Sequence, residues 1–120
     1  MVLGIAAFGL GLVIDASPDP TASNATVQIL QPSPGEEVPA GRPIDVAVEL
    51  TNGSLALSPN DTSGGHLHLS VDGQLQQMPY TTEAQITLQP GVHQIRVEYV
   101  DYQHLSFSPE VTTTIDVTAA

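Results

Sequence analysis

The sequence predicts an all-β protein, built as a sandwich of two antiparallel sheets with about seven strands. From Ala25 onward, apolar and polar residues alternate with a period of two, which is the pattern of half-buried strands. Pro, Gly, Asn and Asp interrupt the alternation at short intervals, as turns do. No stretch after Ile14 has the apolar spacing of an amphipathic helix. Short strands joined by turns favour two packed sheets over a single open one.

The alternation defines the strands in chain order. The Asp72-Gly73 dipeptide predicts a tight hairpin turn, and Pro90-Gly91 predicts a second turn. The predicted strands are 25–30, 44–50, 66–71, 74–80, 84–88, 92–100 and 111–118.

Two of these strands carry the candidate functional residues. In 66–71 the two leucines and Val71 face inward, which leaves His66 and His68 on the outer face. In 92–100 the alternation directs Ile95, Val97 and Tyr99 inward. The residues of this strand that we expect to face outward are Gln94, Arg96 and Glu98.

The N-terminal part differs in composition from the rest. Residues 2–14 form an uncharged apolar run, which suits the hydrophobic region of a secretion signal and is short for a membrane span. We therefore expect 1–23 to be a signal peptide or membrane anchor with a short linker, and 24–120 to be the sandwich domain. No Lys or Arg precedes the run, unlike in most signals, and a buried first helix is the alternative.

The charge balance limits the partners. The chain has thirteen acidic residues and only two basic ones, Arg42 and Arg96, which gives a net charge of −11. This surface repels phosphate backbones and anionic lipids, so we expect no nucleic-acid binding and membrane contact only through the N-terminal segment. An exported domain would be secreted, periplasmic or anchored at the cell surface, facing a protein or cell-envelope partner. In a glycosylating cell its sequons at Asn24, Asn52 and Asn60 would be acceptors.

The sequence contains none of the common enzyme signatures. Cysteine is absent, which excludes disulfides, thiolate metal sites and cysteine nucleophiles. There is no Gly-x-Ser-x-Gly elbow and no Gly-rich phosphate-binding loop. We expect a non-enzymatic protein.

The histidines lie in a recurring pattern of motifs. A Gly-His-x-His-Leu-x-x-Asp strand is followed by a Pro-Gly-x-His strand opening and a later Asp-x-x-His. Over about half of the chain this pattern resembles a family of exported bacterial and archaeal immunoglobulin-like domains of unknown function, although the histidine-bearing insert of longer members is missing. The resemblance implies an immunoglobulin-like fold and an extracytoplasmic location, and no established activity. The matching residues are Gly65, His66, His68, Leu69, Asp72, Pro90, Gly91, His93, Asp101 and His104.

The spacing of the histidines suggests a metal site. In an immunoglobulin-like order, 66–71 and 92–100 are antiparallel neighbours, which places His66 and His68 near Asp101 and His104. His93 opens the second of these strands and would lie about 20 Å away. We therefore predict His66, His68 and His104 as ligands of copper or zinc, with Asp101 as a ligand or as a residue that orients one.

A structural interpretation of the same residues remains open. Outward-facing histidines can hydrogen-bond to loops, His93 can fix the turn at Pro90, and Asp101 with His104 can brace the aromatic-rich loop 99–109. The sequence thus predicts a non-enzymatic, extracytoplasmic binding or accessory module. The alternative is a histidine-based domain that buffers or delivers copper or zinc.

Overall fold

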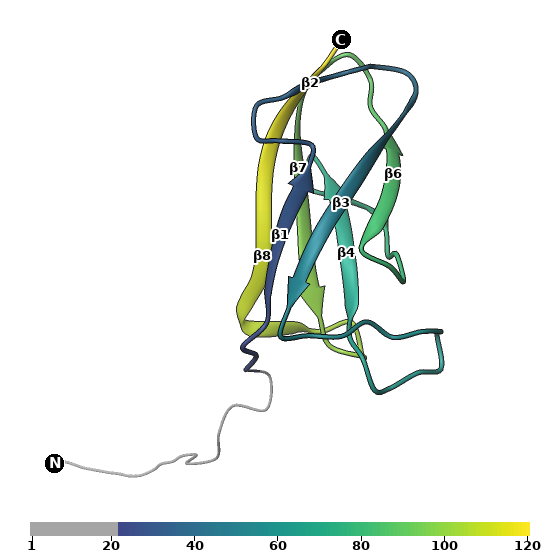
Figure 1. The fold of residues 1–120 in the computed structure, drawn as a ribbon, viewed down its shortest axis with the longest axis vertical. Coiled ribbons are helices and arrows are strands. Elements are labelled where there is room, and N and C mark those ends of the chain that lie inside the picture. Colours follow the sequence, from purple (N-terminus) through teal and green to yellow (C-terminus); the bar gives the residue numbers. More distant parts are fainter. Residues whose placement is uncertain (1–21) are drawn as a thin grey trace, which may run out of the picture.

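The computed structural model describes residues 22–120, which form two sheets and no helix (Figure 1). One sheet has the order β1-β3-β6 and the other the order β2-β8-β7-β4-β5. All neighbouring strands are antiparallel except β2 and β8, which are parallel. The strands are β1 (Thr26–Gln31), β2 (Glu37–Val38), β3 (Pro43–Thr51), β4 (His66–Val71), β5 (Gln74–Gln77), β6 (Glu83–Thr87), β7 (Gly91–Val100) and β8 (Ser106–Ala119).

The predicted immunoglobulin-like sandwich is confirmed, and the strand that alternation did not predict is the two-residue β2. β8 begins at Ser106, several residues before the predicted start of the last strand. The signal or anchor predicted for 1–23 lies almost wholly outside the described residues. Among residues 22–120, no helix has the length and hydropathy needed to cross a membrane.

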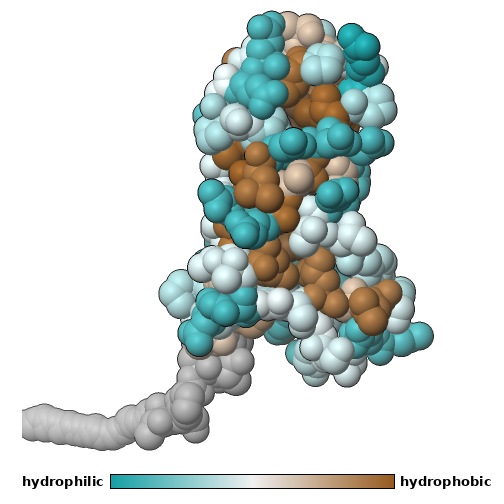
Figure 2. Space-filling model, in the orientation of Figure 1, coloured by the Kyte–Doolittle hydropathy of each residue, from teal (hydrophilic) through white to brown (hydrophobic). Residues whose placement is uncertain are grey.

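One end of the sandwich is formed by the loops 52–65 and 101–105, and we call it the loop end. Hydrophobic atoms reach the surface over this end as well as between the strands (Figure 2). Leu57 in the first of these loops is 86% exposed, and Tyr102 and Leu105 in the second are about half exposed. The described part of the chain thus leaves apolar side chains uncovered on both loops of this end.

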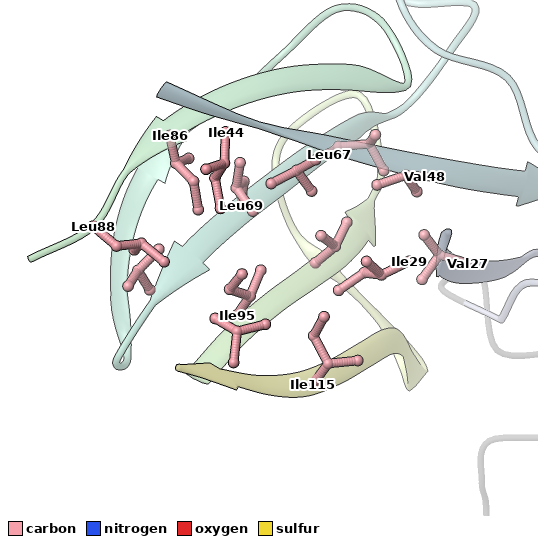
Figure 3. Close-up of a cluster of buried hydrophobic side chains, with 14 of the residues drawn as sticks. Val27, Ile29, Ile44, Val48, Leu67, Leu69, Ile86, Leu88, Ile95 and Ile115 are labelled. Carbon is pink, nitrogen blue, oxygen red and sulfur yellow. The ribbon is translucent and has the colours of Figure 1, made fainter. Parts of the chain in front are cut away.

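The core lies between the two sheets (Figure 3). Val46 of β3, Leu67 and Leu69 of β4, and Ile95 and Val97 of β7 are each at most 2% exposed. They occupy alternate positions, so the period of two in the sequence is the period at which side chains enter the interior. The inward faces predicted for 66–71 and 92–100 are confirmed.

The pairing of β4 with β7 fixes the positions of the histidines. His66 lies opposite Val100, His68 opposite Glu98, and Val71 opposite Ile95. The start of β4 therefore lies beside the end of β7, as the sequence predicted for these two strands. His93, seven residues before Val100, lies about 20 Å away at the other end of the sheet.

Truncation of a core side chain should destabilise the protein strongly. Leu67→Ala removes a side chain that is 1% exposed, and we expect the free energy of unfolding to fall by about 2–5 kcal/mol because a cavity is left. Leu75→Ala, at an exposed position on β5, should change it by about 0.5 kcal/mol or less. Urea denaturation followed by circular dichroism measures both, and equal effects would contradict this description of the core.

Candidate functional site: a histidine cluster at the loop end

His66, His68 and His104 lie together at the loop end. The rings of His66 and His104 are stacked, with centroids 4.0 Å apart and planes 11° apart. The ring of His68 lies 5.3 Å from that of His104, and His68 Nε2 is 3.0 Å from His104 Nδ1. At that distance the two nitrogens form a hydrogen bond, so one of them carries the hydrogen and the other accepts it. His104 is thus in contact with both histidines of β4.

Asp101 builds the turn that presents His104. Its Oδ1 accepts hydrogen bonds from the backbone N–H groups of Gln103 and Leu105, at 2.8 and 2.9 Å. Its carbonyl accepts one from the N–H of His104 at 2.9 Å. His104 has a φ of 65°, which is uncommon for a residue other than glycine. In this arrangement Asp101 orients His104 through the backbone.

Two of the three histidines are sheltered from solvent. His66 is only 5% exposed, although it is on the outer face of β4, because His104 and Tyr80 cover it. The ring of Tyr80 meets it edge-on at 6.2 Å. Burial, and next the neighbouring His104, lower the pKa of His68 below its usual range. His68 is therefore neutral at neutral pH, with a ring nitrogen free to accept a hydrogen or bind a cation.

Glu98 belongs to the same site, and the sequence did not indicate this. Alternation predicted that Glu98 faces outward; in addition, its side chain is only 7% exposed, and it lies directly opposite His68. Its Oε1 is 3.5 Å from a guanidinium nitrogen of Arg96. Its Oε2 is buried and has no hydrogen-bond partner within residues 22–120. A buried carboxylate oxygen without a partner is costly, so it marks a position where a cation would be stabilised.

The predicted metal ligands are near one another but are not arranged as a finished metal centre. Among residues 22–120, no three His, Asp or Glu side chains are already placed to hold one ion. The stacking of His66 on His104 explains part of this, since in-plane lone pairs of parallel rings do not converge on one point. Asp101 uses one carboxylate oxygen within its own turn. Metal binding by this end stays a prediction.

Gly64 and Gly65 let the loop 52–65 pass close to β7 just before His66. A Cβ atom on Gly65 would lie 2.2 Å from the carbonyl oxygen of Val100 and 2.8 Å from the ring of Tyr99. On Gly64 it would lie 2.5 Å from the backbone of Leu55. Neither distance is possible for real atoms, so both positions require glycine, and the Gly-Gly-His order in the sequence has a steric cause.

Substitution of Gly65 should therefore disturb the site. Gly65→Ala forces the loop away from β7, and we expect a loss of about 1–3 kcal/mol of stability from overpacking. The matched control is Gly73→Ser, where a Cβ meets nothing within 4 Å and only the positive φ is disfavoured. Thermal unfolding compares the two, and a Gly65→Ala protein as stable as the wild type would contradict the close approach.

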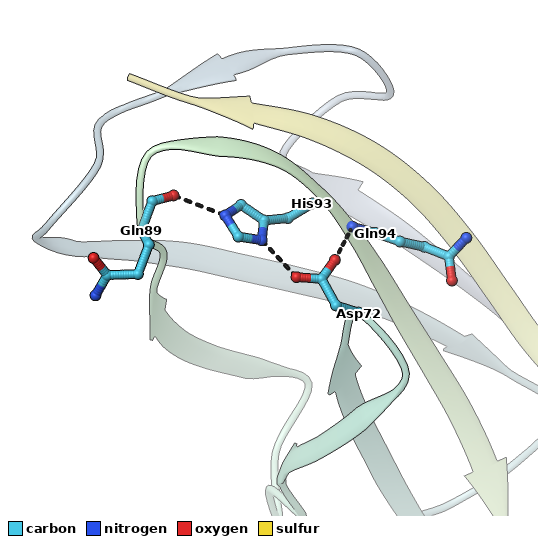
Figure 4. A network of polar contacts seen from close by, with 4 residues as sticks. All are labelled: Asp72, Gln89, His93 and Gln94. Carbon is cyan, nitrogen blue, oxygen red and sulfur yellow. Dashed lines mark hydrogen bonds and ion pairs between the residues drawn. The ribbon is translucent and has the colours of Figure 1, made fainter.

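His93 forms a separate clamp at the other end of the sheet (Figure 4). Its Nε2 donates to the carbonyl of Gln89 at 2.7 Å, and its Nδ1 pairs with Asp72 Oδ2 at 2.6 Å. The other oxygen of Asp72 accepts from the N–H of Gln94 at 2.9 Å. A carbonyl and an ionised carboxylate only accept, so both ring nitrogens carry hydrogen and His93 is an imidazolium ion. The sequence-based expectation that His93 fixes the turn at Pro90 agrees with this geometry.

The clamp should give stability a defined dependence on pH. The hydrogen bond to Asp72, followed by that to Gln89, raises the pKa of His93 above its ordinary 6.5. The hydrogen bonds from Gln94 and His93 lower the pKa of Asp72 below its ordinary 3.8. The His93 contribution is complete below pH 6.5 and is lost as pH rises through the raised pKa. The Asp72 contribution is complete above pH 3.8 and is lost as pH falls through the lowered pKa.

We therefore expect the clamp to stabilise the protein most between these two ordinary values. The difference in unfolding free energy between wild type and His93→Gln should be largest there and should shrink on either side. Urea titrations across the pH range measure this difference, and an NMR titration of the His93 ring reports its pKa. A pKa of His93 below that of an exposed histidine would contradict the imidazolium assignment.

Comparisons with known proteins support the fold. No family model and no curated protein matches the chain. Among solved structures it is similar to the fibronectin(III)-like modules of CbhA from Clostridium thermocellum, with a TM-score of 0.55 and 14% identity, covering 78% of this chain and 96% of that one. The fold is fibronectin(III)-like.

Two larger proteins also match this chain over part of their length. An engineered protein matches with a TM-score of 0.54 and 13% identity, over 91% of this chain and 21% of its own length. An endo-beta-1,4-mannanase from Thermotoga petrophila matches with a TM-score of 0.48 and 15% identity, over 98% of this chain and 32% of its own. The two matches with TM-scores above 0.5 support the fold, and at 13–14% identity they leave activity open.

Proposed function

We propose that this fibronectin(III)-like domain is a non-enzymatic binding or accessory module that acts outside the cytoplasm. The observation that carries the proposal is that the two loops of the loop end each expose apolar or aromatic side chains, Leu57 on one and Tyr102 and Leu105 on the other. Exposed apolar and aromatic side chains are typical of contact sites for other proteins. The secretion-like composition of residues 2–14 supports the extracytoplasmic location.

The loop that presents Leu57 is held in place by hydrogen bonds. Asp61 accepts from the N–H of Leu57 at 2.8 Å and from the hydroxyl and N–H of Ser63 at 2.5 and 2.8 Å. These bonds, the Ser63 hydroxyl first, lower the pKa of Asp61 to about 2. The Asp61 carboxylate therefore stays ionised at any physiological pH. A loop that is ordered before it binds loses less conformational freedom on contact.

The aromatic residues of 99–109 divide into two roles. Tyr99 is buried, its ring stacks on Phe107 with centroids 5.5 Å apart, and its hydroxyl donates to the carbonyl of Ser54 at 2.8 Å. These two rings cap the core and tie the loop 52–65 to β7. Tyr102 is left exposed. Its exposure leaves the ring free to contact a partner.

The fibronectin(III)-like fold supports a role as a non-catalytic module. The net charge of −11 favours a partner with a basic surface.

Copper or zinc binding, for buffering or delivery, is the second candidate function. The unpartnered carboxylate oxygen of Glu98, whose backbone lies opposite His68 on the neighbouring strand, favours it, as does the His68–His104 pair. Neutral imidazole nitrogens and a carboxylate oxygen are ligands that both ions accept.

Polar substitution at the loop end should weaken binding without unfolding the domain. We expect the full-length chain to bind saturably to cell envelopes of its source organism, and Leu57→Ser with Leu105→Ser to weaken this binding about tenfold or more, as loss of central apolar contacts does. The control is Leu75→Ser with Val92→Ser, which removes exposed apolar side chains outside the loop end. A fluorescence binding assay measures all three proteins. Absence of saturable binding, or equal weakening by the control, would contradict the proposal.

A further inference from the structure

We propose that His68, His104 and Glu98 together bind one copper(II) or zinc(II) ion at the loop end. This ligand set rests on the second candidate function, metal binding, and does not depend on the contact surface around Leu57. It differs from the set that the sequence suggested, because Glu98 supplies the carboxylate in place of Asp101 and His66 is not a ligand.

The His68–His104 pair already has nearly the separation of two ligands on one ion. Their nearest nitrogens are 3.0 Å apart. With metal–nitrogen bonds of about 2.0–2.1 Å in tetrahedral geometry, two imidazole nitrogens lie about 3.3 Å apart. The nitrogens must separate by a few tenths of an ångström, and both rings must turn so that their lone pairs converge. The outer torsion of a histidine side chain has a broad energy well, and the turn of His104 also requires a small shift in its stack on His66.

Glu98 supplies an independent sign that a cation belongs at this place. It lies opposite His68 on the neighbouring strand, so the two side chains leave the same face of the sheet about 5 Å apart at their Cα atoms. Its Oε1 is near Arg96, while its buried Oε2 has no partner in the described residues. No three such groups yet surround one point in residues 22–120, so the Glu98 side chain would have to turn toward the histidines. That oxygen would then gain a partner in the ion and would be the third ligand beside the two imidazoles.

His66 and Asp101 act as positioning residues in this arrangement. The ring of His66 stacks on His104 and is itself held by Tyr80, which fixes one face of the His104 ring. Asp101 sets the turn through its bonds to Gln103 and Leu105. Residues that orient a ligand in this way usually change metal affinity by about 10–100-fold when replaced.

Metal binding would strengthen the link that the contacts of His104 with His66 and His68 already make between the loop 101–105 and the sheet. His68 is on β4, Glu98 is on β7, and His104 is in the loop 101–105. An ion held by all three would link that loop to the centre of the five-stranded sheet. Thermal stability should rise with metal concentration, because an ion that binds only the folded chain stabilises it by mass action.

The test is isothermal titration of Zn(II) and Cu(II) into the full-length chain and four variants. His68→Gln, His104→Asn and Glu98→Gln each remove one proposed ligand. Asparagine is chosen at 104 because it tolerates the positive φ there. Glutamine at 98 keeps the shape and removes a buried charge, so the fold should survive. Glu110→Gln is the matched control, since Glu110 is an exposed carboxylate that also pairs with Arg96.

We expect the wild type and Glu110→Gln to bind one ion per chain, and each of the other three variants to bind at least about tenfold more weakly. On Zn(II) addition, the ring nitrogen resonances of His68 and His104 should shift in NMR spectra, while those of His93 should not. Circular dichroism confirms that each variant is folded.

Three outcomes would overturn the proposal. Absence of one-to-one binding by the wild type would remove metal binding as a function. Wild-type affinity in Glu98→Gln, or in either histidine variant, would leave metal binding in place but reject this ligand set. An equal loss in Glu110→Gln would show that the ion responds to the overall negative charge and not to this site.

Discussion

The register between β4 and β7 is the constraint on which the rest of the structure depends. These strands are neighbours within the five-stranded sheet, and they pair from His66–Val100 to Val71–Ile95. This pairing determines which side chains meet on the inner face of the sheet and which meet on the outer face. On the inner face it places Leu67 and Leu69 in the core. On the outer face it puts His68 opposite Glu98. A slip of one residue would exchange the faces, so core packing protects the geometry of the histidine cluster.

The two ends of this sheet use histidine in opposite ways. At one end Asp72 and the Gln89 carbonyl surround His93 with acceptors, which raises its pKa and makes the charged ring a link between two turns. At the loop end burial and His104 lower the pKa of His68. The same side chain is therefore a charged clamp in one place and a neutral donor of lone pairs in the other, and the neighbours alone decide which.

The sequence was sufficient to predict the features that depend on local alternation. It predicted the strands, the inward faces of 66–71 and 92–100, the proximity of His66, His68 and His104, and the separate role of His93. It could not predict that Glu98 is buried, because that depends on how other side chains cover the outer face. The stacking of His66 on His104 likewise follows from the turn at Asp101. Such contacts join segments distant in sequence, and periodicity carries no information about them.

The buried carboxylate of Glu98 is the feature that a purely structural account explains least well. A small domain is only marginally stable, and an unpartnered charged oxygen on a central strand consumes part of that stability. Glutamine at this position would pack equally well without the charge. Residues that break the rules of folding in this way tend to be found where a protein binds something. Arg96 lies near one of its oxygens, and His68 lies opposite it on the neighbouring strand. The proposed metal ion would give the other oxygen the positively charged partner that the described residues do not supply.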